Sequence, residues 1–75
     1  MVQVRSLLID VEALTALGVE HGIDTVAELS RRTGVSQWVL YNSLRSGRMQ
    51  PSHVKAIAEA FGVERDQILR TEVSA

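Results

Sequence analysis

The chain has 75 residues, which leaves room for one small domain. A domain of this size buries only about 60% of the surface that its unfolded chain exposes, so its core is thin. The sequence contains no cysteine, which excludes disulfide bridges and thiolate zinc sites. With 45% hydrophobic and 23% charged residues, the composition is typical of an ordinary globular chain and not of a disordered one. We therefore expect residues 1–75 to form a single domain that folds by apolar packing.

The net charge is −1, but the charges are unevenly distributed along the chain. Between Leu29 and Ala58 there is no acidic residue, and all nine acidic residues lie outside that stretch. The same stretch contains five basic residues: Arg31, Arg32, Arg45, Arg48 and Lys55. Such a locally basic surface steers an anionic partner more strongly than the total charge suggests. The alternative is a basic face that is only solvated.

No apolar run approaches the roughly 20 residues that a membrane-spanning helix needs. The N-terminus also lacks a basic segment followed by a long apolar stretch, which is the pattern of a secretion signal. We therefore expect a cytoplasmic protein without a membrane partner.

The first nine residues fit two interpretations. Val2 and Val4 alternate with polar neighbours as in a strand, whereas Val4, Leu7, Leu8 and Val11 also share a helix face. An extended segment over residues 1–9 is favoured, because Asp10 is a good N-cap and its neighbours have the spacing of a hydrophobic staple. A first helix then carries a short apolar stripe and ends near residues 21–22. The staple and stripe residues are Ile9, Val11, Leu14 and Leu17.

Two further helices are predicted between residues 25 and 47. The first begins with a capping-box pattern, Thr25 with Glu28, and ends at Gly34, where a left-handed residue is needed. The second begins after Ser36, another good N-cap, and ends at Gly47. Their apolar positions are Val26, Leu29, Val39, Leu40 and Leu44.

The last part of the chain predicts two more helices. The fourth begins at Pro51 or Ser52, ends at Gly62 and follows the full i, i+3, i+4, i+7 apolar template. The residues on that template are Val54, Ile57, Ala58 and Phe61. A short fifth helix over 64–70 buries Ile68 and Leu69, and residues 71–75 form a frayed tail. The fold expected is therefore all-α with five helices and a short extended segment at the N-terminus.

Enzymatic interpretations find little support in the residues. His21 and His53 lie on different predicted helices and have no carboxylate at metal-ligand spacing. His21, near a helix C-terminus, is most simply a surface residue that suits the helix dipole. There is no glycine-rich phosphate loop, and so short a chain has little surface for a water-excluding pocket. We expect no catalytic activity, metal, cofactor or small-molecule substrate.

The joint between the second and third helices is the most informative feature. Only Val35 separates Gly34 from Ser36, so the two helices must cross at a steep angle, as in a helix-turn-helix. This arrangement places Leu29, Val35 and Leu40 inward. One face of the third helix is then left free to project outward.

The segment TVAELSRRTGVSQWVLYNSLRSGR (residues 25–48) resembles the helix-turn-helix of the lambda repressor/Cro family. The downstream stretch PSHVKAIAEAFGVERDQIL resembles the fourth and fifth helices of that family, and together the similarity covers about residues 10–70. The chain departs from the family pattern at Ser30, where alanine is usual, at Thr33, where a larger apolar residue is common, and at Ser43, a polar residue at a half-buried site. The short chain is most similar to Cro and to small phage regulators, which implies a bacterial host cytoplasm.

The resemblance implies that the helix over 36–46 enters the major groove by its N-terminal end. Gln37 then occupies the position that typically binds adenine through N6 and N7. The base-reading residues are expected to be Gln37, Trp38, Tyr41 and Asn42. Phosphate contacts are expected from Ser36, Arg45, Arg48, Lys55 and Arg32. For Trp38 there is an alternative, in which the indole packs against a neighbouring helix or a dimer partner.

The function implied is sequence-specific binding of double-stranded DNA by a Cro-type repressor that acts at an operator. Related regulators usually act as homodimers on pseudo-palindromic sites. A homodimer could use the apolar N-terminus or residues 61–69, although the N-terminus could equally cover the domain's own core. Two alternatives remain: an antitoxin-like or adaptor protein-interaction module, and a recombination or architectural DNA-binding factor.

Overall fold

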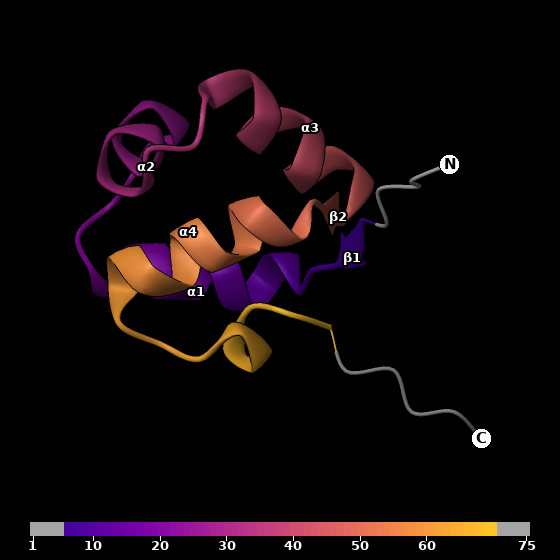
Figure 1. The fold of residues 1–75 in the computed structure, drawn as a ribbon. Helices are drawn as coiled ribbons and strands as arrows, with labels where there is room; N and C mark the ends of the chain where they lie inside the picture. The colour runs from indigo at the N-terminus through magenta and orange to yellow at the C-terminus, as the bar shows by residue number, and fades with distance from the viewer. Residues whose placement is uncertain (1–5, 71–75) are drawn as a thin grey trace.

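The computed structural model describes residues 6–70, which form four α-helices and a small two-stranded sheet (Figure 1). The elements in chain order are β1 (Leu7–Leu8), α1 (Val11–Glu20), α2 (Val26–Thr33), α3 (Gln37–Ser46), β2 (Arg48–Met49), α4 (Pro51–Phe61) and the 3-10 helix η1 (Arg65–Gln67). The predictions that involve Val2, Val4 and the tail at 71–75 lie outside the described residues.

The N-caps predicted for the first two helices, Asp10 and Thr25, are confirmed. The Asp10 carboxylate accepts a hydrogen bond from the Ala13 N–H at 3.0 Å, and the Thr25 hydroxyl accepts one from the Glu28 N–H at 3.1 Å. Each bond satisfies one of the amides that a helix leaves unpaired in its first turn. The second half of the capping box is not found, because the Glu28 carboxylate pairs with Arg31 on the same helix instead.

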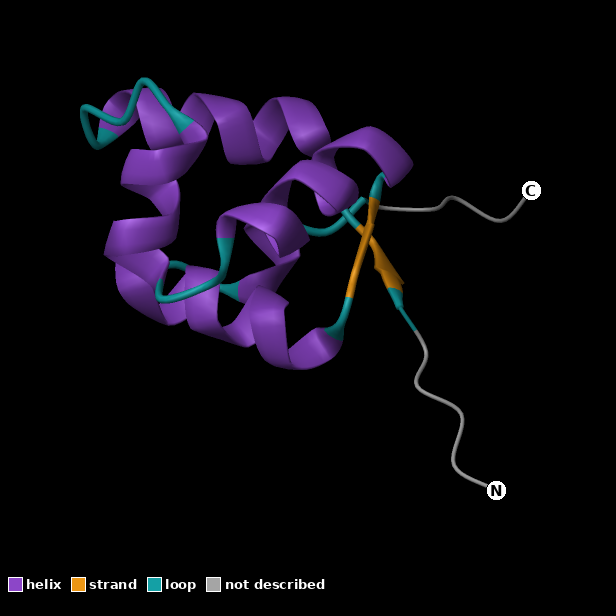
Figure 2. Ribbon diagram, turned by 90° about the horizontal axis from the view of Figure 1, so that it is seen from above, coloured by secondary structure: helices purple, strands orange, loops and turns teal. Residues whose placement is uncertain are grey.

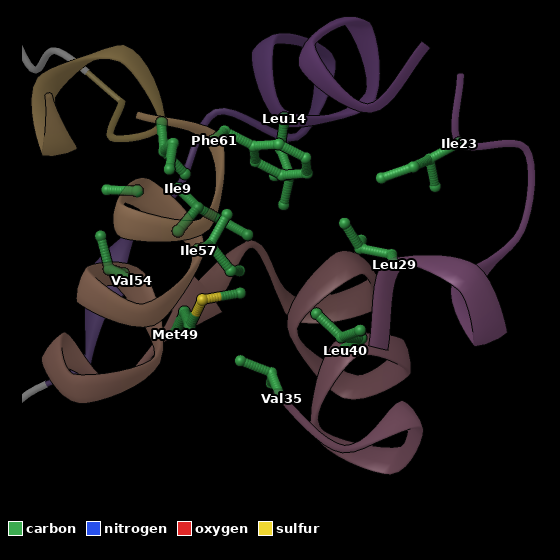
Figure 3. Packing of buried hydrophobic residues seen from close by; sticks show 12 residues of the cluster. Ile9, Leu14, Ile23, Leu29, Val35, Leu40, Met49, Val54, Ile57 and Phe61 are labelled. Carbon is green, nitrogen blue, oxygen red and sulfur yellow. The ribbon is translucent and has the colours of Figure 1, made fainter. Parts of the chain in front are cut away.

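The four α-helices and β2 contribute buried residues to one apolar cluster, and Leu7 of β1 packs against it, whereas η1 contains no buried residue (Figure 3). The inward positions expected at the helical corner and along α4 are confirmed. The buried residues are Ile9, Leu14, Ile23, Leu29, Val35, Leu40, Met49, Val54, Ile57, Ala58, Phe61 and Ile68. Helix α2 contacts both α3 and α4, so this cluster holds the pair of helices α2 and α3 against α4.

The extended segment expected near the N-terminus is confirmed for residues 7–9. Strand β1 pairs antiparallel with β2, with Leu7 opposite Met49 and Leu8 opposite Arg48 (Figure 2). On the other side of the same segment, Ile9 forms a bridge with Leu69. The segment therefore lies between β2 and the C-terminal residues.

The predicted fifth helix over 64–70 is not observed. Only Arg65–Gln67 forms a turn, a 3-10 helix, and Leu69 then pairs with Ile9 in extended geometry. The backbone of this segment is used elsewhere: the Ile68 carbonyl accepts from the Asp10 N–H at 2.7 Å, and the Arg70 N–H donates to the Leu8 carbonyl at 3.0 Å. These bonds to the N-terminal segment replace those that would continue a helix, so the fold is mostly helical but has four α-helices.

None of the helices in the described part of the chain is long and apolar enough to cross a membrane.

Ile68 anchors the C-terminal segment, since its side chain is 0% exposed although it follows only a short turn. We expect Ile68→Ala to lower the free energy of unfolding by about 2–5 kcal/mol, because it removes buried methyl groups and leaves a cavity. Urea denaturation measures this change. The matched control is Gln67→Ala at the adjacent exposed position, for which we expect a change within about 0.5 kcal/mol. Equal effects of the two substitutions would contradict the packing described.

Candidate nucleic-acid interface

A tight corner connects α2 to α3. Gly34 ends α2 with φ 78° and ψ 3°, in the left-handed region, and its N–H donates to the Ser30 carbonyl at 2.8 Å. Val35 follows with its side chain buried, and Ser36 caps α3 by accepting a hydrogen bond from the Val39 N–H at 3.2 Å. The corner predicted from the sequence is therefore present, with glycine at the residue whose backbone requires it.

Thr33 strengthens this corner in a way that the sequence reasoning missed. Its hydroxyl donates to the Leu29 carbonyl at 2.8 Å and accepts from the Val35 N–H at 3.2 Å. One side chain thus adds a hydrogen bond to a carbonyl one turn back in α2 and binds an amide beyond the end of the helix. The departure from the usual apolar residue at this position therefore supplies the turn with hydrogen bonds.

Helix α3 has two distinct faces. Leu40 and Ser43 are buried on the inner face, at 0% and 4% exposure. The outer face carries five exposed residues, spaced so that they share one side of the helix: Gln37, Trp38, Tyr41, Asn42 and Arg45. Trp38 is 75% exposed and Tyr41 56% exposed, so neither ring is buried in the core of this chain. All four side chains predicted to read bases therefore project from one face.

The two amide side chains on this face differ in their hydrogen bonds. The Asn42 amide nitrogen donates to the Trp38 carbonyl at 2.8 Å, one helical turn back. Within residues 6–70, no hydrogen bond involves the amide of Gln37, the first residue of α3. The amide oxygen and nitrogen of Gln37 thus form no hydrogen bond with the described residues, whereas the Asn42 nitrogen donates one to the backbone of its own helix.

An open groove of about 350 Å³ lies beside α3, between that helix, β2 and the start of α4. It brings together three of the predicted residues, Trp38, Asn42 and Arg48, but not Gln37, Tyr41, Arg45 or Lys55. It also adds polar residues that the sequence reasoning missed: Ser6, Ser46, Gln50 and His53. No pattern in the sequence could have identified this group, because it forms only when β2 and α4 fold back beside α3.

Residues 14–74 match the family model described as the Cro/C1-type HTH DNA-binding domain. This chain belongs to that family. The match covers most of the chain, including all of α2, α3 and α4. No curated protein and no solved structure matched in the corresponding comparisons. Membership supports DNA binding and a role in regulating transcription, and it is consistent with the absence of enzymatic motifs from the sequence.

The basic residues of this Cro/C1-type domain are mostly unpaired. In the described part of the chain the one salt bridge joins Arg31 to Glu28. The other four basic residues of the predicted surface are exposed and form no salt bridge within residues 6–70: Arg32, Arg45, Arg48 and Lys55. Their charge is therefore available to an anionic partner, whereas that of Arg31 is partly compensated.

The two histidines do not form a site together. His21 lies at the C-terminal end of α1, is exposed and has its ring centroid 4.7 Å from that of Phe61. His53 lines the groove, and its Nδ1 atom is buried without a hydrogen-bond partner. Among residues 6–70, no group of three or more histidine or carboxylate side chains could hold a metal ion.

The geometry of Gly34 gives a direct test of the corner. We expect Gly34→Ala to lower the free energy of unfolding by about 1–2 kcal/mol, because an L-residue is strained in the left-handed region. A Cβ atom at this position meets nothing within 4 Å, so the loss comes from the backbone and not from a clash. Urea denaturation measures it. Gly34→Asn serves as the comparison and should lose less, since asparagine adopts this conformation more readily; an alanine variant as stable as the native chain would contradict the assignment.

Proposed function

We propose that this Cro/C1-type domain is a Cro-type transcriptional repressor of the phage kind that reads an operator with α3 in the major groove. The observation that carries the proposal is the division of α3 into two faces. Its inner face is buried in the core, while its outer face presents Gln37, Trp38, Tyr41 and Asn42 to solvent. The major groove, about 12 Å wide, admits a helix with such a face.

Base recognition is assigned to the outer face of α3. Gln37 is placed at the N-terminal end that enters the groove first, and its free amide can both donate to adenine N7 and accept from N6. Asn42 reads a second base edge. Trp38 and Tyr41, whose rings are exposed, contact a thymine methyl group or the sugar-phosphate backbone.

Phosphate contacts are assigned to Ser36, Arg45, Arg48, Lys55 and Arg32. Such contacts fix the position of the protein on DNA without reading sequence. Arg48 is the strongest candidate, because its backbone belongs to β2, which is paired with β1, and its side chain is exposed beside the groove. Arg32 is the weakest, since a cation at the end of α2 also stabilises the helix dipole.

We further propose a homodimer on a pseudo-palindromic operator, with half-sites about 10 bp apart. One reading helix offers few base contacts, and a second copy doubles them. Residues 61–69 are the less suitable of the two dimer surfaces, because Phe61 and Ile68 are buried in the chain's own core. Leu7 and Leu8 are only partly buried and leave apolar surface at the N-terminal segment.

A protein-interaction module, antitoxin-like or adaptor-like, is the second candidate. The exposed rings of Trp38 and Tyr41, at 75% and 56%, favour it, since such residues are common anchors of protein interfaces. DNA binding must weaken steeply as salt rises, because phosphate contacts release counterions, whereas an apolar protein contact need not. A recombination or architectural role uses the same DNA contacts and differs only in the sites bound.

Selection of bound duplexes from a random pool tests the proposal. We expect enrichment of one site with two-fold symmetry, bound with an affinity that falls linearly with salt on logarithmic axes. Enrichment of a site without symmetry would remove the homodimer but leave the repressor. No enrichment above background would overturn the proposed function.

The role of Gln37 predicts a local loss of specificity. We expect Gln37→Ala to weaken binding to the selected site by about 1–3 kcal/mol and to relax the preference at one base pair. Titration against the selected duplex and its single-base variants measures both effects. An equal loss on every sequence would assign Gln37 to the backbone instead.

The phosphate contact proposed for Arg48 predicts a different effect on DNA binding from that of Gln37. We expect Arg48→Ala to weaken binding to all sequences alike and to reduce the salt slope by about one. The matched control is Arg65→Ala, which removes the same charge from an exposed position on η1, across α4 from α3 (Figure 1). If the two variants lower the salt slope equally, net charge and not a contact at Arg48 accounts for the change.

A further inference from the structure

His53 lines the groove beside α3, and one of its two ring nitrogens is buried without a partner. The residue lies in the first turn of α4, and its side chain is partly buried. The unpaired atom is Nδ1, and proteins pair nearly all of their buried polar atoms. The Nε2 atom is not among the buried unpaired atoms, and no hydrogen bond joins it to another of residues 6–70. Nε2 is therefore the ring nitrogen that can meet a ligand.

The buried nitrogen determines where the imidazole ring carries its hydrogen. A neutral ring has one N–H, on either Nδ1 or Nε2, and a protonated ring has both. On Nδ1 of His53 the hydrogen of a neutral ring would be a buried donor without an acceptor. In the protein backbone such donors are rarer than unpaired buried acceptors, and the same preference places the hydrogen on Nε2. Nε2 is thus a donor in both charge states of the ring.

The other groups of the groove favour an anionic ligand. Among the described residues that line it, Arg48 is the only charged one, so no carboxylate faces the ring from the groove wall. The Arg48 side chain is exposed and forms no salt bridge within residues 6–70. Its backbone is held in place, because its N–H donates to the Ser46 hydroxyl at 3.2 Å and β2 pairs with β1. A guanidinium group beside an imidazole N–H suits the oxygens of a phosphate group.

We infer that His53 is a phosphate-binding residue, which donates from Nε2 to the DNA strand that Arg48 contacts. This role rests on the proposed function, since it requires α3 to lie in the major groove. The groove shares Trp38 and Asn42 with the outer face of α3, so a strand that borders the major groove beside that face runs alongside His53. Because phosphate contacts carry no sequence information, His53 contributes to affinity for all sequences alike.

Variants of His53 test which ring nitrogen makes the contact. The amide nitrogen of glutamine is as many bonds from the Cα atom as Nε2 of histidine, whereas that of asparagine matches Nδ1. On the duplex selected from the random pool, we expect His53→Ala and His53→Asn to weaken binding by about 10-fold, as for loss of a hydrogen bond to a charged group. His53→Gln keeps a donor at the Nε2 position and should lose less than about 3-fold. The control is His21→Ala, at the end of α1 and outside the groove, which should leave affinity unchanged.

Replacement of single phosphates separates a contact from a loss of stability. In a methylphosphonate a methyl group takes the place of one charged oxygen, so the phosphate loses its charge and an acceptor. We expect the native chain to bind about 10-fold more weakly when the phosphate that His53 contacts is replaced. In His53→Ala, that one phosphate should lose most of its effect. A variant that is merely less stable binds every duplex more weakly by the same factor, and its pattern of sensitive phosphates stays unchanged.

Three results would overturn the inference: a His53→Ala variant that binds the selected duplex as tightly as the native chain, an unchanged pattern of sensitive phosphates, or equal losses in His53→Gln and His53→Asn. The last result would assign the effect to packing of the ring and not to a donor at Nε2. Failure of the proposed function is distinct, because the random pool then yields no enriched duplex and His53 has no DNA strand to contact.

Discussion

The burial of the inner face of α3 is the constraint on which the proposed interface depends. Leu40 is fully buried, and Val35 is buried at the corner that precedes it, in one cluster with Leu29 of α2. Because this packing fixes the rotation of α3 about its axis, the opposite side chains must face solvent. A domain of this size has a small core, so apolar packing alone contributes limited stability. The corner is also stabilised by the hydrogen bonds of the Thr33 hydroxyl and by the left-handed conformation of Gly34.

The segments over residues 7–10 and 68–70 come together beside the end of α3. The Ile9 N–H donates to the carbonyl of Gly47, the residue that ends α3, at 2.9 Å, and β1 pairs with β2, which contains Arg48. Leu69 pairs with Ile9 and so lies on the other side of the N-terminal segment from β2. The position of Arg48 relative to the reading helix is therefore set by the pairing of β2 with the N-terminal segment, and not by α3 alone.

The net charge of the protein is −1, but the distribution of its charges still permits binding to an anionic partner. The described acidic residues lie in or near α1, at the start of α2 and after the middle of α4, whereas α3 and β2 contain none. Only Arg31 is paired with a carboxylate within the described residues. A basic surface can thus face a duplex while the rest of the domain keeps the total near neutral, because the local field governs the encounter.

The sequence by itself determined the four α-helices, their caps at Asp10, Thr25 and Ser36, and the corner at Gly34, since these depend on hydrogen bonds and apolar spacing within a few residues. It also determined which side chains of α3 face outward. Only the tertiary structure decided that the segment after η1 pairs with Ile9 instead of forming a helix, that Gln50 and His53 line a groove with Asn42, and that the Asn42 nitrogen bonds to its own helix. The first two features depend on contacts between residues far apart in the chain, and the third on which of several side-chain conformations the folded helix favours, so local patterns could not predict them.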